Sequence, residues 1–459
     1  MPQGRDLAVD LHRRTHVPLQ HVDHMHGLIH HHAAAFGFMG IMSGDKIVEV
    51  DGVNVAGIGI TNNDVMAKLK GPKGTIVKVG IKRKNTKDLI RYDITRDKIP
   101  IYSVDASYMA APEIGYIKVS RFAKTTTEEL RAALTSLKDQ GMKDLILDLQ
   151  DNGGGLLNSA VEMADEFLGN ERLLVYTEGR SFMREDYKAR IPGSFEKGRL
   201  VVLIDEASAS ASEIVSGAIQ DWDRGLIVGR RSFGKGLVQK PIYLPDGSAV
   251  RLTTQKYYTP AGRCIQKPYD EGNEAYRKDQ MERWESGEFF HADSIHVPDS
   301  LKFTTNVKKR LVYGGGGIIP DVFVALDTSA NSGYFADLLR TGVTNNYAIN
   351  YVDRNRAELQ AKYKNIDAFK SGFVVTDDML KEIQRIAEQD EKIAFVEEDY
   401  KRSEEAIRIR VKALIARNLF DNAAFFVIIN DLNESFKKAV QTLQDGTFEK
   451  SKLAFNDFK

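Results

Sequence analysis

The chain has 459 residues, enough for about two to four domains with sizeable cores. Its 64 basic and 64 acidic side chains give a formal net charge of zero, which argues against bulk electrostatic binding of nucleic acid. The single cysteine, Cys264, excludes an internal disulfide framework. No apolar run reaches the ~18 residues of a transmembrane helix, and the N-terminus lacks the apolar core of a signal peptide.

Residues 1–38 form a histidine-rich segment that holds eight of the ten histidines. Such a run is typical of a metal-binding tract. The histidines follow no repeating spacing, however, and no cysteine or carboxylate pattern accompanies them. We therefore expect no metal site here, and interpret the segment as a disordered tail, an artefact of expression or a misread start of the gene.

Residues 39–97 contain two alternating strand patterns around a short helical segment. One strand is expected within 40–52, between two turns, another at 75–83, and the helix near 63–69. This order resembles most of a PDZ domain, which binds an extended peptide along a sheet edge and holds its terminal carboxylate in a backbone nest. The carboxylate-binding segment of such a domain would precede Gly40, where the histidine-rich segment stands instead. Two interpretations stay open: a peptide-binding module that is incomplete at its N-terminal end, and a small packing domain without a ligand.

A second domain begins near residue 98. A strand is predicted at 114–120, a helix follows with Thr126 and Glu129 placed as a capping box, and 145–149 is a buried strand. A glycine turn, 153–155, then leads into another helix. Such a turn can cradle phosphate, but no Gly-Lys-Ser, Gly-Lys-Thr or Gly-x-Gly-x-x-Gly motif supports nucleotide binding. The alternative is an oxyanion hole, because glycine lets a backbone N–H approach a reacting carbonyl.

The stretch 207–213, Ala-Ser-Ala-Ser-Ala-Ser-Glu, lies between a predicted buried strand at 200–205 and a predicted helix. A serine in this turn can hold its hydroxyl clear of the sheet, near the free N–H groups that begin the helix. Such serines also occur as plain helix caps or as small residues packed against a sheet. A further strand, 225–229, follows, and then Lys235 between two glycines.

The pattern Ser-Ala-Ser-Ala-Ser-Glu, Phe-Gly-Lys-Gly and Val-Gln resembles the carboxy-terminal processing peptidases, the tail-specific serine-lysine proteases of peptidase family S41. Stretches 257–262 and 315–322 also match that family, so the resemblance covers residues 40 to about 330. It implies that Ser210 is the nucleophile, Lys235 the base and Gln239 the residue that orients the lysine. It places the oxyanion donors at the backbone N–H groups of Gly154 and Ala211.

The resemblance implies a multidomain α/β fold. Its expected parts are the histidine-rich segment 1–38, a PDZ-like β-rich module at 39–97, a ClpP/crotonase-like protease core at 98–330 and a C-terminal helical region at 331–459. It implies a serine endopeptidase that acts without a cofactor on unfolded or C-terminally tagged proteins. Protein or peptide substrates, an adaptor protein and a homo-oligomer are the partner classes that it adds, and the cell envelope or periplasm is the expected location.

The lysine must be neutral to accept a proton, and burial favours the neutral form because desolvation penalises the ammonium. We expect Phe233 and the flanking glycines to place it in a dry pocket. The alternative function is a non-enzymatic PDZ scaffold on a protease-like fold, against which the intact Ser210, Lys235 and Gln239 argue. His291 and His296, in a charged insertion at 266–312, are expected to be surface residues.

From about residue 330 the pattern is helical. Thr376 is expected to cap one helix, and two more are expected around 406–415 and 425–443. Such amphipathic helices can bind a partner, dimerise or wrap the core, and wrapping is the expected role.

Overall fold

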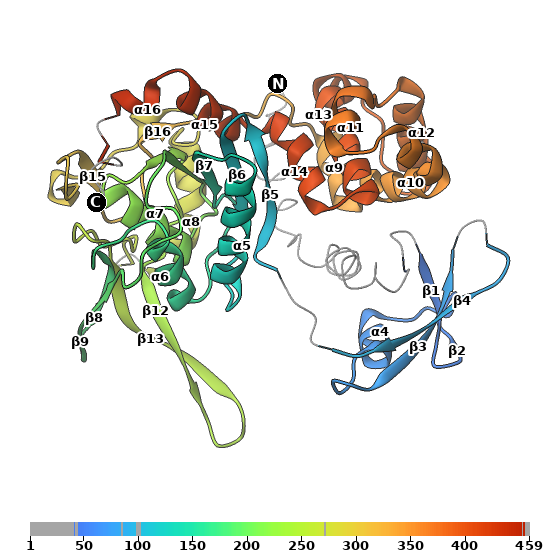
Figure 1. Ribbon diagram of the computed structural model, residues 1–459, viewed down its shortest axis with the longest axis horizontal. Coiled ribbons are helices and arrows are strands. Elements are labelled where there is room, and N and C mark those ends of the chain that lie inside the picture. Colours follow the sequence, from blue (N-terminus) through green and yellow to red (C-terminus); the bar gives the residue numbers. More distant parts are fainter. Residues whose placement is uncertain are drawn as a thin grey trace, which may run out of the picture. The chain divides into compact units, whose positions relative to one another are not determined.

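A computed structural model of the chain describes residues 41, 45–83, 86–97, 102–269, 272–451 and 453–454 (Figure 1). The histidine-rich segment 1–38 lies outside these described residues. The chain divides into two compact units. One contains residues 102–328 and 426–459, and the other contains residues up to 101 together with 329–425.

The first unit is organised around a six-stranded sheet with the order β16-β11-β10-β7-β6-β5. All neighbouring strands are parallel except β5, which runs antiparallel to β6. The side chains of the central strands are buried on both faces, which is why their sequences are nearly continuous apolar runs. The strands are β5 (Val104–Ala111), β6 (Ile114–Val119), β7 (Asp144–Asp148), β10 (Leu200–Ile204), β11 (Leu226–Gly229) and β16 (Val322–Phe323).

Helices cover both faces of this sheet. The connections through α5 (Thr126–Asp139), α6 (Leu157–Asp165) and α7 (Ala211–Asp221) step across the sheet in one direction, so right-handed crossovers place these helices on one face. The other face is left to α15 (Glu434–Gln444), which packs against β7, β10 and β11. The chain after residue 426 thus returns to the sheet, where Asn433 bonds to Gln150 and the Ala454 N–H to the Asp223 carbonyl. The expected helical region 331–459 is therefore divided between the two units.

The capping box predicted at the start of α5 is wrong. The N-cap residue is Thr125, which makes no side-chain cap bond to a backbone N–H. The Glu129 carboxylate instead accepts hydrogen bonds from the N–H groups of Ser103 and Val104, at 2.7 and 2.9 Å. The Glu129 carboxylate therefore binds backbone groups about 25 residues earlier instead of capping its own helix.

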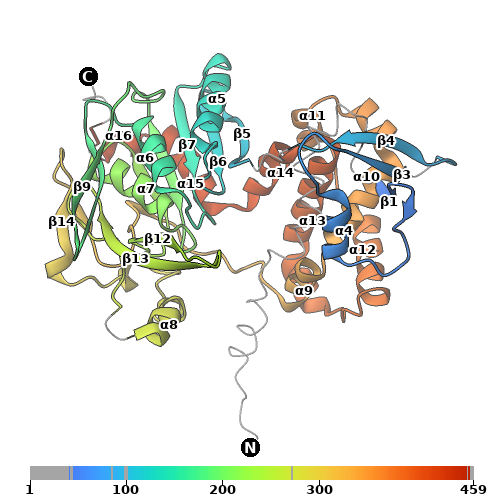
Figure 2. The same cartoon turned by 90° about the horizontal axis from the view of Figure 1, so that it is seen from below.

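A second sheet of the same unit has the order β12-β13-β8-β9. It contains β8 (Leu173–Gly179), β9 (Phe182–Lys188), β12 (Leu237–Tyr243) and β13 (Ala249–Tyr258). Strands β12 and β13 pair as an antiparallel hairpin, and Figure 1 shows this ribbon extending beyond the rest of the unit. The insertion contains α8 (Gly272–Glu285), two short 3-10 helices, β14 (Lys302–Thr304) and β15 (Leu311–Tyr313), and α8 lies at the edge of the unit (Figure 2).

The second unit contains the PDZ-like segment and a group of helices. A four-stranded antiparallel sheet, β2-β1-β3-β4, surrounds a small core of Val50, Val55, Val77, Val79 and Ile81. Its elements are β1 (Lys46–Val50), β2 (Val53–Asn54), α4 (Asn62–Leu69), β3 (Ile76–Lys82) and β4 (Ile90–Thr95), and they confirm the predicted strands and helix.

Seven α-helices besides α15 follow residue 328 in the described chain. They are α9 (Gly333–Thr341), α10 (Val343–Lys362), α11 (Ile366–Gly372), α12 (Asp377–Gln389), α13 (Glu397–Leu419), α14 (Asn422–Ile429) and α16 (Thr447–Lys450). Thr376 caps α12 as predicted, because its side chain accepts from the Met379 N–H. Across the described part of the chain, no helix combines the length and the apolar character that crossing a membrane requires.

Candidate active site

Ser210 stands at the point where the chain leaves β10 and enters α7. Its φ and ψ are +58° and −111°, a conformation that L-residues rarely adopt. Strain of this kind persists only where the surrounding structure enforces it, and it concentrates at functional sites. The turn therefore marks Ser210 as a functional candidate on backbone geometry alone.

The two serines on either side of Ser210 have structural partners. Ser208 and Ser212 are fully buried, and their hydroxyls donate to the carbonyls of Leu149 and Asn152, each at 2.8 Å. Ser210 is partly exposed. Burial thus distinguishes the middle serine as the one that a substrate can reach.

A buried carboxylate joins the Ser210 turn to the segment that carries Lys235. Glu213 Oε2 accepts from the N–H groups of Ser210 and Lys235, at 2.7 and 2.9 Å, while Oε1 accepts from Ser232 Oγ and Gly234 N, both at 2.6 Å. Burial raises the pKa of Glu213, although these four hydrogen bonds oppose the rise. The motif contained Glu213, but sequence reasoning gave it no role. Its position three residues after the helix N-cap was the available signal.

Lys235 is only partly buried, so the expected dry pocket is incompletely formed. Within the described ranges, its amine makes no hydrogen bond or ion pair with another side chain. Gln239 is exposed on β12, opposite Thr253 and just after a bulge in the ribbon. No described contact joins its side chain to Lys235. The structure therefore brings the Ser210 and Lys235 main chains together through Glu213, and leaves Gln239 apart from them.

The glycine turn, residues 153–155, lies directly against the serine turn, residues 207–213. A Cβ added to Gly154 would lie 2.7 Å from Ser210 Cβ, 2.7 Å from the Ala209 carbonyl oxygen and 2.9 Å from the Ala211 nitrogen. The Gly154 N–H already donates to Asn152 Oδ1 at 2.9 Å. For the Ala211 N–H, by contrast, the described residues offer no acceptor. The two predicted oxyanion residues are thus neighbours, but only Ala211 has an unengaged donor.

The Asp205 carboxylate joins the glycine turn to the serine turn. Its carboxylate accepts from the N–H groups of Asp151, Ala207 and Ser208 at 3.0–3.1 Å. Burial, followed by repulsion from Asp151 and Glu206, raises the pKa of Asp205 to about 7. This aspartate was part of the predicted strand, but nothing in the sequence indicated its bonds to a turn 54 residues earlier.

Tyr257 is the other residue that sequence reasoning missed. It lies in β13, is 2% exposed, and its hydroxyl donates to the Lys235 carbonyl oxygen. The sequence placed it in a family-like stretch without indicating any contact.

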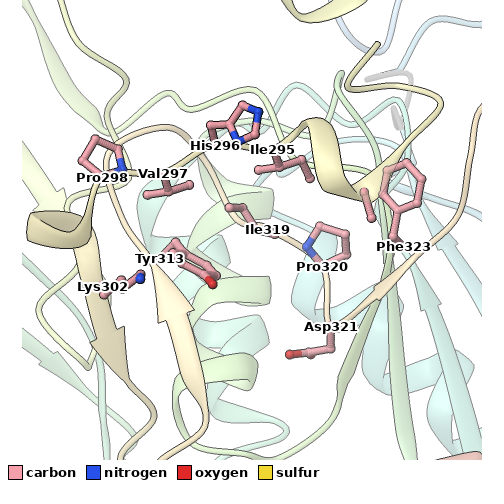
Figure 3. A pocket seen from close by; sticks show the side chains of 11 residues that line it. Ile295, His296, Val297, Pro298, Lys302, Tyr313, Ile319, Pro320, Asp321 and Phe323 are labelled. Carbon is pink, nitrogen blue, oxygen red and sulfur yellow. The ribbon is translucent and has the colours of Figure 1, made fainter. Parts of the chain in front are cut away.

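The remaining candidates lie away from these groups. His291 and His296 are exposed, as predicted. His296 lines an open cavity of about 730 Å³ together with Lys302, Tyr313 and Asp321 (Figure 3). None of the predicted site residues lines this cavity. Burial raises the pKa of the Cys264 thiol, which does not favour a reactive thiolate.

Comparison with known proteins places this geometry in context. Residues 113–272 match the model of peptidase family S41, and residues 334–421 match a family of unknown function, DUF8443. The chain is 36% identical over 231 residues to a carboxyl-terminal-processing protease of Picosynechococcus sp., covering 50% of this chain and 55% of the relative. It is 38% identical over 234 residues to a carboxy-terminal-processing protease of Bartonella bacilliformis, covering 50% and 52%.

Among solved structures, the photosystem II D1 C-terminal processing protease is 29% identical, with a TM-score of 0.35 and coverage of 63% of this chain and 65% of that one. The chain spans about half the length of the two bacterial relatives. The family match contains the serine turn, the glycine turn, Lys235 and Tyr257. The segment 113–272 therefore belongs to peptidase family S41.

Proposed function

We propose that the chain is a serine endopeptidase of the C-terminal processing type, with Ser210 as nucleophile and Lys235 as general base. One observation carries the proposal: the partly exposed serine on a strained turn is bound, through the Glu213 carboxylate, to the main chain of Lys235. A nucleophile and a base held by one buried group have the fixed mutual geometry that covalent catalysis needs.

In the proposed reaction Ser210 Oγ attacks the carbonyl carbon of a peptide bond, and the neutral Lys235 amine takes the hydroxyl proton. The negative charge moves to the carbonyl oxygen, which the Ala211 N–H stabilises. Gly154 leaves room for that oxygen, and its own N–H joins Ala211 only by exchanging its bond to Asn152. As the C–N bond breaks, the lysine ammonium returns the proton to the leaving amine.

Water then hydrolyses the acyl-enzyme, with the same lysine as base. Gln239 is proposed to orient the lysine. Its side chain is exposed in this structure, so this role is proposed to begin only when a substrate is bound. The substrates are proposed to be unfolded or C-terminally tagged proteins, which the PDZ-like module at 39–97 would present to the core. The cell envelope or periplasm is the proposed location.

The proposal is tested by digestion of an unfolded protein, such as reduced casein, with purified full-length chain. We expect Ser210→Ala and Lys235→Ala to reduce the initial rate to below about one-thousandth of wild type, and the double variant to be no slower than either single variant. Ser216→Ala is the matched control on α7, since its hydroxyl donates within the helix, and Lys240→Ala is the control on β12. Full activity in Ser210→Ala would mean that another residue is the nucleophile, and no activity in the wild type would favour the scaffold alternative.

A further inference from the structure

Tyr257 reaches the segment that carries the proposed base from a strand that contributes neither nucleophile nor base. Its N–H donates to the Gly236 carbonyl at 3.0 Å, which fixes β13 beside the residue that follows Lys235. Its ring belongs to the apolar core, with only 2% of its surface exposed. The hydroxyl is thereby held in one place, in contact with the Lys235 carbonyl.

The chemistry of a phenol sets what this hydroxyl does. A tyrosine hydroxyl has one proton, and here it is donated to the Lys235 carbonyl oxygen. Burial, and the nearby Glu213 carboxylate, raise the pKa of Tyr257 well above its usual value. The phenol therefore stays neutral at physiological pH and does not compete with Lys235 as a base.

We propose that Tyr257 is a positioning residue of the proteolytic site: its hydroxyl anchors the Lys235 main chain and so sets where the lysine side chain can reach Ser210. The inference rests on the proposed function. It complements Glu213, which binds the N–H groups of the same two residues. Glu213 holds the N–H of Lys235, whereas Tyr257 holds the carbonyl oxygen of the same residue.

The next residue supplies a matched control. Tyr258 is adjacent in sequence, but its ring stacks on Tyr176 at 4.8 Å with an interplanar angle of 8°. It is partly exposed, and its hydroxyl makes no hydrogen bond among the described residues. Phenylalanine at either position removes one oxygen atom and keeps the ring. The two variants therefore differ mainly in whether that oxygen contacts the Lys235 carbonyl.

The experiment compares wild type, Tyr257→Phe and Tyr258→Phe in steady-state hydrolysis of a fluorogenic peptide, with the melting temperature measured for each. We expect Tyr257→Phe to lower kcat by about 10- to 100-fold while KM stays within about twofold, because orientation of the base affects the chemical step and not peptide binding. Tyr258→Phe should match wild type in both parameters. The affinity for the same peptide, measured in a Ser210→Ala background, should be unchanged by Tyr257→Phe.

Two results would overturn the inference while leaving the proposed function intact. One is a Tyr257→Phe kcat within about twofold of wild type when Ser210→Ala is inactive. The other is a strongly lowered melting temperature together with a raised KM, which would assign Tyr257 to folding alone. If Ser210→Ala instead retains full activity, the proposed function fails and this inference fails with it.

Discussion

Alanine at Gly154 should disable the serine turn, whereas alanine at the adjacent Gly153 should not. Gly154 has φ of +95°, and an added methyl would meet the Ala209 carbonyl, Ser210 Cβ and the Ala211 nitrogen at 2.7–2.9 Å. Most of these are backbone atoms, which cannot rotate away as the end of a flexible side chain can. At Gly153 nothing lies within 4 Å of the added atom, and φ is not positive.

The magnitude follows from two separate costs. An L-residue held at this φ costs about 1–3 kcal/mol, and forcing a methyl into a packed site costs a further ~1–3 kcal/mol. Gly154→Ala should therefore lower the free energy of unfolding by about 2–6 kcal/mol, unless the serine turn moves to relieve the contact. Such a movement displaces the Ala211 N–H and Ser210, and a misplacement of about 1 Å costs on the order of 100-fold in rate. Gly153→Ala should stay within about 0.5 kcal/mol of wild type.

The assay pairs denaturant unfolding with the initial rate on an unfolded protein for both variants. The reasoning requires Gly154→Ala to lose stability, activity or both, and Gly153→Ala to lose neither. Wild-type stability and activity in Gly154→Ala would refute it, since the two turns would then not be packed as described. Equal losses in both variants would show that the glycine turn tolerates no side chain at all, independently of the serine turn.

Three further predictions concern the groups around the site. Glu213→Gln should lower the free energy of unfolding by about 1–3 kcal/mol and reduce kcat, because either orientation of the amide leaves a backbone N–H without an acceptor. A variant as stable as the wild type in urea titrations would contradict this. The folded-state pKa of Asp205, about 7, lies above its unfolded value, so wild-type stability should fall as pH rises from about 5 to 8. Asp205→Asn should flatten that dependence, and parallel pH profiles for the two proteins would count against it. Proteolysis should persist in excess chelator, because the proposed steps use only a hydroxyl, an amine and backbone N–H groups; loss of activity that zinc restores would overturn this.

The elements whose structure is set by local sequence were predictable. The apolar runs at 200–204 and 226–229 became buried parallel strands, because both faces of such strands are covered. Thr376 caps its helix through a bond to the residue three positions later, which the sequence displays directly. The stretch around Ser210 was likewise readable as a strand-to-helix turn, because its small residues stand between an apolar run and a helical pattern.

The contacts that complete the site depend on residues distant in sequence, and these were not predictable. Glu213 bonds to groups 19–22 residues later, and Asp205 to a turn 54 residues earlier. Glu129 looked like a local cap but is drawn to Ser103 instead. A single sequence shows that a carboxylate is present and not which buried N–H groups it will meet. The roles given to Lys235 and Gln239 remain predictions.

The central claim, that Ser210 forms an acyl-enzyme with Lys235 as its base, is tested most directly by trapping that intermediate. Turnover of a peptide substrate would be stopped with acid, and the digested protein analysed by mass spectrometry. The account predicts that the acyl group lies on the peptide that contains Ser210, and that Lys235→Ala yields no such adduct. An adduct on another residue such as Cys264, or undiminished acylation in Lys235→Ala, would contradict it.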